Sequence, residues 1–169
     1  MSKTATYALI DSYTFPSAQS SLTFSSIPGT YTDLRVVFNG GVASGSLNLY
    51  MQYNSDTGTN YSSRNITADG SSAFSLSPLS NVTNIICNYY GYLTADMNTN
   101  INIDIMDYSN TTTNKTNLTR SNNAGNGVAA VVGLWRNTNA ITSIKFFPDS
   151  GNFSTGSSFK LYGIQAGNA

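Results

Sequence analysis

Apolar and polar residues alternate along most of this chain, and this period of two constrains the fold more than any other feature. The stretches SLNLYMQY (residues 46–53) and SFKLYGI (residues 158–164) place an apolar residue or glycine at every second position, and NINIDIMD (residues 100–107) does so at Ile101, Ile103 and Ile105. Successive side chains of a β-strand point to opposite faces of a sheet, so the pattern predicts strands with one buried face. Further strands are expected at residues 4–10, 22–24, 33–38, 61–66, 82–90, 116–120, 128–135 and 142–147.

The composition and the turn signals favour the same fold class. Charged residues make up 9% of the chain, against about 25% in ordinary globular domains, and Asn, Ser, Thr and Gly replace them. These residues favour turns and strands over helices. Turns are expected where residues that tolerate φ > 0 or pre-set a turn gather, at residues 28–29, 39–41, 69–70, 122–125 and 149–151. We predict an all-β protein, a single antiparallel β-sandwich, jelly-roll-like, with about ten or eleven short strands.

The length of 169 residues fits one domain with a real hydrophobic core. We expect this β-sandwich domain to span residues 1–169, with residues 1–6 either joining the first strand or forming a short N-terminal arm. The polar stretch at residues 108–115 is expected to be a loop between two strands, not a hinge between domains.

The charge pattern argues against nucleic acid and membrane partners. The formal net charge is +0, and the eight Lys and Arg residues are scattered singly, whereas nucleic-acid binding needs a concentrated basic face. No apolar run approaches the roughly 20 residues of a membrane-spanning helix. The first residues do not resemble a signal peptide, so we expect synthesis in a cytoplasm without export by the usual route.

The tripeptide Asp56-Thr57-Gly58 is the one sequence that resembles a catalytic motif, that of the aspartic proteases. Those enzymes bring two such loops together so that two carboxylates share a proton, but this chain has one copy in a polar setting. Asp-Thr-Gly also forms turns, in which the Asp side chain bonds nearby backbone and Gly takes φ > 0. The turn is the favoured interpretation of Asp56.

Other catalytic and metal-binding chemistries lack their residues. The chain has no His, so a serine or cysteine nucleophile would lack its usual base, and zinc would lack its usual ligands. Asp104 and Asp107 should project to opposite faces of a strand, which does not make the carboxylate pair of a glycosidase. The single cysteine, Cys87, is expected to be a buried hydrophobic side chain. We therefore expect no enzyme, no cofactor, no catalytic residues and no metal site.

Aromatic residues are the remaining candidates for a binding surface. The chain has 11 Tyr and 8 Phe, and Tyr89, Tyr90 and Tyr92 lie within four positions, so at least one ring should be exposed. Exposed rings suit a sugar or a protein interface. The alternative is that these rings cover the edge of a thin core. For Trp135 and Arg136 the same two interpretations stay open: interface or ligand contacts, or core packing followed by an ordinary surface arginine.

Several stretches in order along the chain resemble a group of small virion structural proteins of tailed bacteriophages. The resemblance lies in residues 6–10 (TYALI), 22–35 (LTFSSIPGTYTDLR), 54–61 (NSDTGTNY), 108–116 (YSNTTTNKT), 133–138 (GLWRNT), 150–153 (SGNF) and 159–164 (FKLYGI). Members of the group are loosely labelled as tail-fibre or minor structural proteins. The resemblance implies no catalytic residue, and it supports the turn interpretation of the Asp56 stretch.

The resemblance implies a protein located on the virion and made in the bacterial host cytoplasm. We expect a capsid decoration or cement protein that stabilises the head; the alternative is a tail-fibre or receptor-binding module that recognises host surface glycan. The partners would be phage structural proteins, either the major capsid protein or tail components, and a homotrimer is expected from the symmetry of such assemblies. A chain that starts with a strand and shows no coiled coil favours the capsid, whereas abundant Asn, Ser, Thr and Tyr favour the glycan alternative.

Overall fold

The structure, a computed structural model, describes residues 6–75, 79–89 and 92–165, in which fifteen β-strands and no helix occur. The strands are β1 (Tyr7–Thr14), β2 (Leu22–Phe24), β3 (Asp33–Gly40), β4 (Ser46–Leu47), β5 (Leu49–Tyr53), β6 (Tyr61–Ala68), β7 (Ala73–Phe74), β8 (Leu79–Val82), β9 (Ile85–Ile86), β10 (Leu93–Thr94), β11 (Thr99–Met106), β12 (Lys115–Asn123), β13 (Gly127–Trp135), β14 (Ile144–Pro148) and β15 (Ser158–Ile164). The expected N-terminal arm lies almost entirely outside the described residues.

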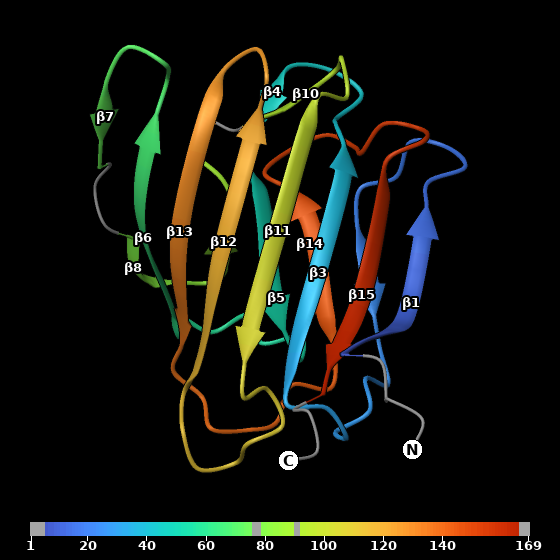
Figure 1. Cartoon of the computed structure of the whole chain (residues 1–169), viewed down its shortest axis with the longest axis vertical. Coiled ribbons are helices and arrows are strands. Elements are labelled where there is room, and N and C mark those ends of the chain that lie inside the picture. The colour runs from blue at the N-terminus through green and yellow to red at the C-terminus, as the bar shows by residue number, and fades with distance from the viewer. Residues whose placement is uncertain (1–5, 76–78, 90–91, 166–169) are drawn as a thin grey trace.

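Nine strands form one large antiparallel sheet. Its order is β1-β15-β3-β11-β12-β13-β6-β7, and β8 also pairs with β6 (Figure 1). The strands β11, β12 and β13 follow one another in both the sequence and the sheet, because hairpin connections join antiparallel neighbours. The long strands at the centre give this sheet a broad outer face, which is turned toward the viewer in Figure 1.

A smaller antiparallel sheet packs behind the large one. Its order is β2-β14-β5-β9, and the short strands β4 and β10 form a separate pair at one end of the molecule (Figure 1). The core lies between the two sheets, so the prediction of an all-β antiparallel sandwich is confirmed. The small sheet has four strands against nine, so it covers only part of the inner face of the large sheet.

The alternation read from the sequence accounts for the inner faces of most strands. Ile101, Ile103 and Ile105 are fully buried, whereas the residues between them are partly exposed. In the same way, Phe159 and Leu161 are buried on β15, beside exposed Lys160.

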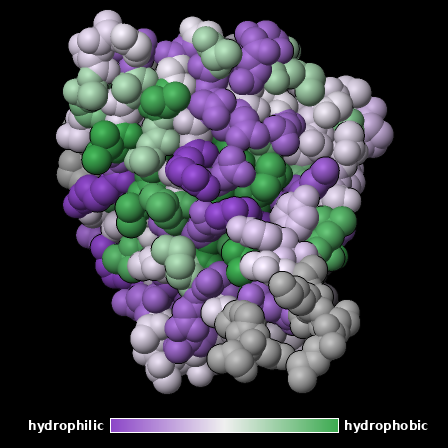
Figure 2. Space-filling model, viewed as in Figure 1, coloured by the Kyte–Doolittle hydropathy of each residue, from purple (hydrophilic) through white to green (hydrophobic). Residues whose placement is uncertain are grey.

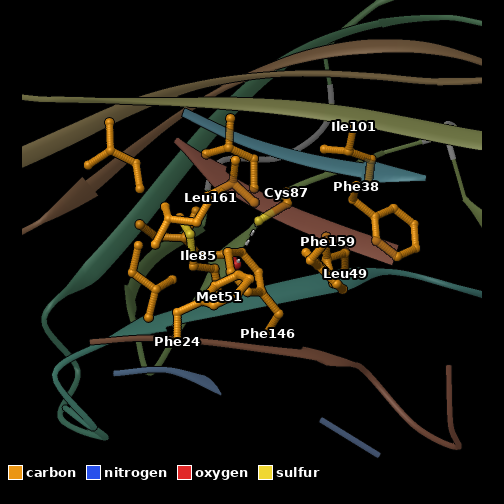
Figure 3. Close-up of a cluster of buried hydrophobic side chains, with 14 of the residues drawn as sticks. Phe24, Phe38, Leu49, Met51, Ile85, Cys87, Ile101, Phe146, Phe159 and Leu161 are labelled. Atoms are coloured by element: carbon orange, nitrogen blue, oxygen red, sulfur yellow. Dashed lines mark hydrogen bonds between the residues drawn. The ribbon is translucent and has the colours of Figure 1, made fainter. Parts of the chain in front are cut away.

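Phenylalanine rings fill the centre of the sandwich. Phe146 on β14 of the small sheet stacks on Phe159 on β15 of the large sheet, with ring centroids 4.8 Å apart. Phe38 on β3 contacts the same ring at 4.6 Å, and Phe153 lies 5.5 Å from it. Figure 3 shows three of these rings with Leu49 and other aliphatic side chains between the two sheets. Such aromatic pairs contribute about 0.5–1.5 kcal/mol each beyond the burial of their area.

Two strands, β6 and β12, depart from the pattern, because their buried faces are polar. On β6 the inward side chains after Tyr61 are Ser63, Asn65 and Thr67. The inward side chains of β12 are Lys115, Asn117, Thr119, Ser121 and Asn123, each at most 3% exposed. Most of their polar groups are hydrogen-bonded; the Asn123 amide, for example, donates to the Tyr92 carbonyl oxygen at 2.8 Å. Periodicity could not reveal these faces, since a polar residue at an inward position carries no apolar signal.

Several expected boundaries differ from the structure. The stretch 46–53 is divided at Asn48 into β4 and β5, because the Asn48 side chain bonds Asp149 and the Leu49 N–H donates to Asn88. The strand expected at 82–90 is wrong: the described residues there form the short β9 and the end of β8. The turn expected at residues 39–41 is also displaced, since Gly40 still belongs to β3. Strands of two residues are too short to leave a periodic signal, which is why their number was underestimated.

No helix long and apolar enough to cross a bilayer occurs in the described ranges.

Gly163 on β15 offers a direct test of the packing beside the sheet. A Cβ atom at this position would lie 2.3 Å from the Tyr31 ring, so the ring and a larger residue cannot occupy the space together. We expect Gly163→Ala to lower the free energy of unfolding by about 1–3 kcal/mol through overpacking. Urea unfolding followed by tryptophan fluorescence measures this. Gly29→Ala is the matched control, because its nearest neighbour would be 3.8 Å from the new atom. Equal stability of the two variants would contradict the packing described here.

Candidate functional site

Trp135, one of the sequence candidates, belongs to the core. Its side chain is 1% exposed and packs between Tyr53, at a centroid distance of 5.5 Å, and Tyr61, at 6.2 Å. The indole Nε1–H donates to Oδ2 of Asp56 at 2.7 Å. Of the two alternatives for Trp135, core packing describes its position, and a ring buried in this way offers no surface to a ligand.

Asp56 lies in the turn after β5, as expected, but the expected positive φ at Gly58 is wrong, because the residues of this turn with positive φ precede Asp56. Asn54 and Ser55 both have positive φ, of 51° and 55°, and the Asp56 N–H donates to the Tyr53 carbonyl at 2.9 Å. The Asp56 Oδ1 accepts the Gly58 N–H at 2.8 Å. Asx turns of this kind satisfy the backbone without a partner strand. The Asp56 carboxylate therefore fixes its own loop and anchors Trp135 at the same time.

The surroundings of Asp56 shift the ionisation of nearby groups. Partial burial opposes the charged carboxylate, but hydrogen bonds from Trp135, Asn60 and Gly58 outweigh it and lower the pKa of Asp56 below its usual value. Burial raises the pKa of Tyr61 to about 12, against a weaker opposite effect of its bond with the Tyr53 backbone. Burial also raises the pKa of Tyr53 well above its usual value. At neutral pH the carboxylate is thus charged and both tyrosines are neutral hydrogen-bonding groups.

Arg136 is exposed and joins the ends of two strands. Its backbone N–H donates to the Asn60 carbonyl at 2.9 Å, and its Nη2 donates to Ser62 Oγ at 2.6 Å. These bonds orient the guanidinium along the surface of β6. Arg136 remains accessible, but it lies beside a buried tryptophan rather than an exposed one.

Two of the three tyrosine candidates, Tyr89 and Tyr92, lie within the described residues. Tyr90 is outside the described residues. Tyr92 is half-buried, and its carbonyl oxygen accepts bonds from Thr99 and Asn123. Tyr89 is half-buried and packs against the cluster of Ile86, Ala129 and Val131, where the inner face of the large sheet extends beyond the small one.

Tyr89 belongs to a group of half-exposed aromatic side chains on the outer side of the small sheet. Tyr50 packs against the same cluster as Tyr89, and its ring lies 5.8 Å from that of Phe147. The Lys145 ammonium lies 5.2 Å from the Phe147 ring centroid, in a cation–π contact. We call Tyr50, Tyr89, Phe147 and Lys145 the aromatic patch. Burial raises the pKa of Tyr50, with a further contribution from Asp149, so its phenol is neutral at physiological pH.

Sequence reasoning missed three members of this patch, Tyr50, Phe147 and Lys145. The two aromatic residues lie on strands whose opposite face is fully buried, in Leu49–Tyr53 and Ile144–Pro148. The sequence did contain an indication: each residue is aromatic but lies between the positions of its strand that face the core. Only the strand pairing Phe147–Tyr50 shows that the two rings are neighbours.

Cys87 is fully buried in the core, as expected, and Figure 3 shows it among the aliphatic side chains. Burial raises the pKa of the thiol well above its usual value, so it remains protonated and poorly nucleophilic.

Lys115 is a buried residue that sequence reasoning missed; its Nζ donates to the carbonyls of Thr113 at 2.7 Å and Thr138 at 3.1 Å. Cys87 thus packs in the core, and Lys115 links the loops that contain Thr113 and Thr138.

The outer face of the large sheet carries a shallow depression of about 510 Å³. Its lining consists of an aliphatic half on β6, β7 and β13 and a polar half on β11 and β12. The main side chains are Ile66, Ala68, Ala73, Val128, Ala130, Asn102, Arg120 and Asn122. Figure 2 shows this face, on which hydrophobic side chains lie among hydrophilic ones. Within the described part of the chain, no group of three or more His, Cys, Asp or Glu side chains could hold a metal ion.

Comparison of the chain with protein-family models, with curated proteins and with solved structures found no match.

The bond between Asp56 and Trp135 leads to a prediction about stability and its pH dependence. In Asp56→Asn, one carboxylate oxygen becomes an NH2 group that faces other donors, so we expect a loss of about 1–2 kcal/mol in the free energy of unfolding at pH 7. The pKa of Asp56 is lower in the folded protein than in the unfolded chain, where it is near 4. The carboxylate therefore contributes fully to the free energy of unfolding above about pH 4. This contribution is lost as the pH falls through the folded pKa.

Urea unfolding of both proteins at a series of pH values from about 2 to 7 checks this. The difference in the free energy of unfolding between the wild type and Asp56→Asn should become smaller as the pH is lowered below about 4. Asp11→Asn, at an exposed carboxylate, is the control and should change stability little at any pH. A difference that widens in acid would contradict the assigned role of Asp56.

Proposed function

We propose that this chain is a structural protein of a bacteriophage virion, in the role of a capsid decoration protein that stabilises the head. The observation that carries the proposal is the aromatic patch on the outer side of the small sheet. Tyr50, Phe147 and Lys145 lie on β5 and β14, strands whose opposite face is buried in the core, and Tyr89 follows β9. The resemblance of the sequence to small virion proteins of tailed phages gives this surface its expected partner.

The chemistry of the aromatic patch suits a protein interface. Tyr50, Tyr89 and Phe147 offer large rigid rings that lose little conformational entropy on binding, and tyrosine is enriched at interface positions that dominate the binding energy. The Lys145 ammonium lies over the Phe147 ring and can also donate to a carboxylate of the partner. A shell surface with an apolar pocket and an acidic rim would complement this group.

A position on the tail, with the chain acting as a receptor-binding module, is the alternative. The depression on the outer face of the large sheet favours it, since a concave surface with amide groups suits glycan recognition. Labelling of intact particles with an antibody against the protein separates the two positions. The decoration role predicts label spread over the head; label confined to the tail would contradict it.

Purified protein added to mature shells that lack it provides the second test. We expect it to bind and to raise the melting temperature of the shells. The double variant Tyr50→Ser/Phe147→Ser should bind at least about tenfold more weakly, because truncated aromatic residues at the centre of an interface cost about 2 kcal/mol or more.

Tyr7→Ser is the matched control for this double variant. Tyr7 is also an exposed tyrosine, at 45%, but it lies on β1 at the far edge of the large sheet. Its loss should leave shell binding unchanged. Equal binding by the control and the double variant, with both folded, would rule out the aromatic patch as the shell contact.

A further inference from the structure

We propose that the depression on the outer face of the large sheet binds a neutral sugar that carries an N-acetyl group. This inference goes beyond the decoration role proposed above and does not depend on it; it names the ligand class of the surface that favours the receptor-binding alternative. It rests on the arrangement of side chains that cross the strands β6, β13, β12 and β11 in register.

The aliphatic half of the depression has a low floor and raised walls. Ala68 and Ala130 provide small side chains on neighbouring strands, and the exposed side chains of Ile66 and Val128 stand beside them. Ile66 is 68% exposed and Val128 is 52% exposed, values that are high for aliphatic residues in the middle of a sheet. A floor of alanines between two branched side chains leaves room for a methyl group or the C–H face of a sugar ring.

The polar half lies directly across from it, in register. Arg120 pairs with Ala130, and Asn122 pairs with Val128, on adjacent strands. Asn102 on β11 pairs in turn with Arg120. Each of these aliphatic side chains on β13 therefore has a hydrogen-bonding side chain about one strand spacing, or roughly 5 Å, away. A ligand in the depression therefore needs an apolar part and a polar part separated by roughly this distance. The methyl group and the ring hydroxyls of an N-acetylated sugar meet this requirement.

The side chains of the polar half include groups that can both donate to and accept from a ligand. Asn102 Nδ2 donates to Asn100 Oδ1 at 2.8 Å, and Asn100 Nδ2 donates to Asn39 Oδ1 at 2.5 Å. This relay leaves Asn102 Oδ1 as an acceptor, and the Asn122 amide makes no hydrogen bond within the described residues. An acetamido group and hydroxyls supply both the donors and the acceptors that these amides lack.

The mostly uncharged lining of the depression favours a neutral ligand. Arg120 is the only ionised side chain of the lining within the described residues, and its Nη2 lies 3.7 Å from Asp104 Oδ2. Asp104 also accepts a bond from Arg35 at 2.5 Å, so two guanidiniums share one carboxylate. The exposed Arg120 side chain therefore keeps N–H donors for the hydroxyls and carbonyls of a ligand, and the other side chains of the lining are neutral.

The concave shape argues against a second copy of the chain as the occupant. A two-fold contact places identical surfaces against each other, so two depressions would face each other and leave a void. A cavity of this kind forfeits van der Waals contacts on both sides. A small ligand that enters the depression avoids this cost.

Titration of isotope-labelled protein with a neutral trisaccharide of N-acetylglucosamine, followed by NMR, tests the inference. We expect saturable shifts at the backbone amides of residues 66–68, 120–122 and 128–130, with a Kd on the order of 1 mM, because an open surface site contacts a single sugar unit. The glucose trisaccharide with the same linkages has hydroxyls in place of the acetamido groups. It should bind at least about fivefold more weakly.

Two variants and a control complete the experiment. Ala130→Phe fills the depression and should abolish the shifts, whereas Ala43→Phe, at an exposed loop position outside the lining, should leave them unchanged. Asn122→Ala removes the Asn122 side-chain amide without altering the floor and should weaken binding about threefold to tenfold, the effect of one hydrogen bond.

The inference would be overturned by the absence of shifts at about 20 mM sugar, by equal binding of the glucose trisaccharide, or by shifts confined to the aromatic patch. It would also be overturned if no sugar binds but Ala130→Phe abolishes shell binding, since the depression would then contact a protein. Antibody labelling of particles that carry Ala130→Phe tests the decoration role independently of sugar binding. Label should still be found on the head, whether or not the sugar binds.

Discussion

The packing of phenylalanine rings between the two sheets is the interaction on which the rest of this structure depends. Phe146 reaches from the small sheet onto Phe159 of the large one, and Phe38 and Phe153 close around the same ring. Few charges and no disulfide contribute to the stability of the described residues, so apolar burial carries most of it. Because this core fixes the distance and angle between the sheets, it also fixes the two outer faces.

The two outer faces differ in shape and chemistry, and this difference underlies both proposals. On the small sheet, Tyr50 and Phe147 protrude from strands whose opposite side is buried, which suits insertion into a pocket of a partner. On the large sheet, Ala68 and Ala130 leave a depression, which suits a ligand that enters it. A sandwich presents these faces in opposite directions, so a protein held to a shell by one face would still expose the other.

Much of the fold could be predicted from the sequence, and the reason is physical. A period of two reports burial on one face, so strands such as β11 and β15, with Ile101 and Phe159 inside, were evident. The inward face of β12 was not, because Asn117 and Thr119 are buried through hydrogen bonds that periodicity does not report. The candidate site was less predictable still. Neighbours such as Phe147 and Tyr50 are brought together by strand pairing between distant segments, and composition contains no information on register.

A structure of the intact virion, determined by electron cryomicroscopy at a resolution that separates β-strands, would show which part of the particle this protein contacts and with which face. We expect density for this sandwich on the head, with the small sheet and its aromatic patch against the shell and the strands β6, β13 and β12 facing solvent. Density on the tail would contradict the decoration role. Density on the head with the large sheet against the shell would contradict the assignment of the two faces.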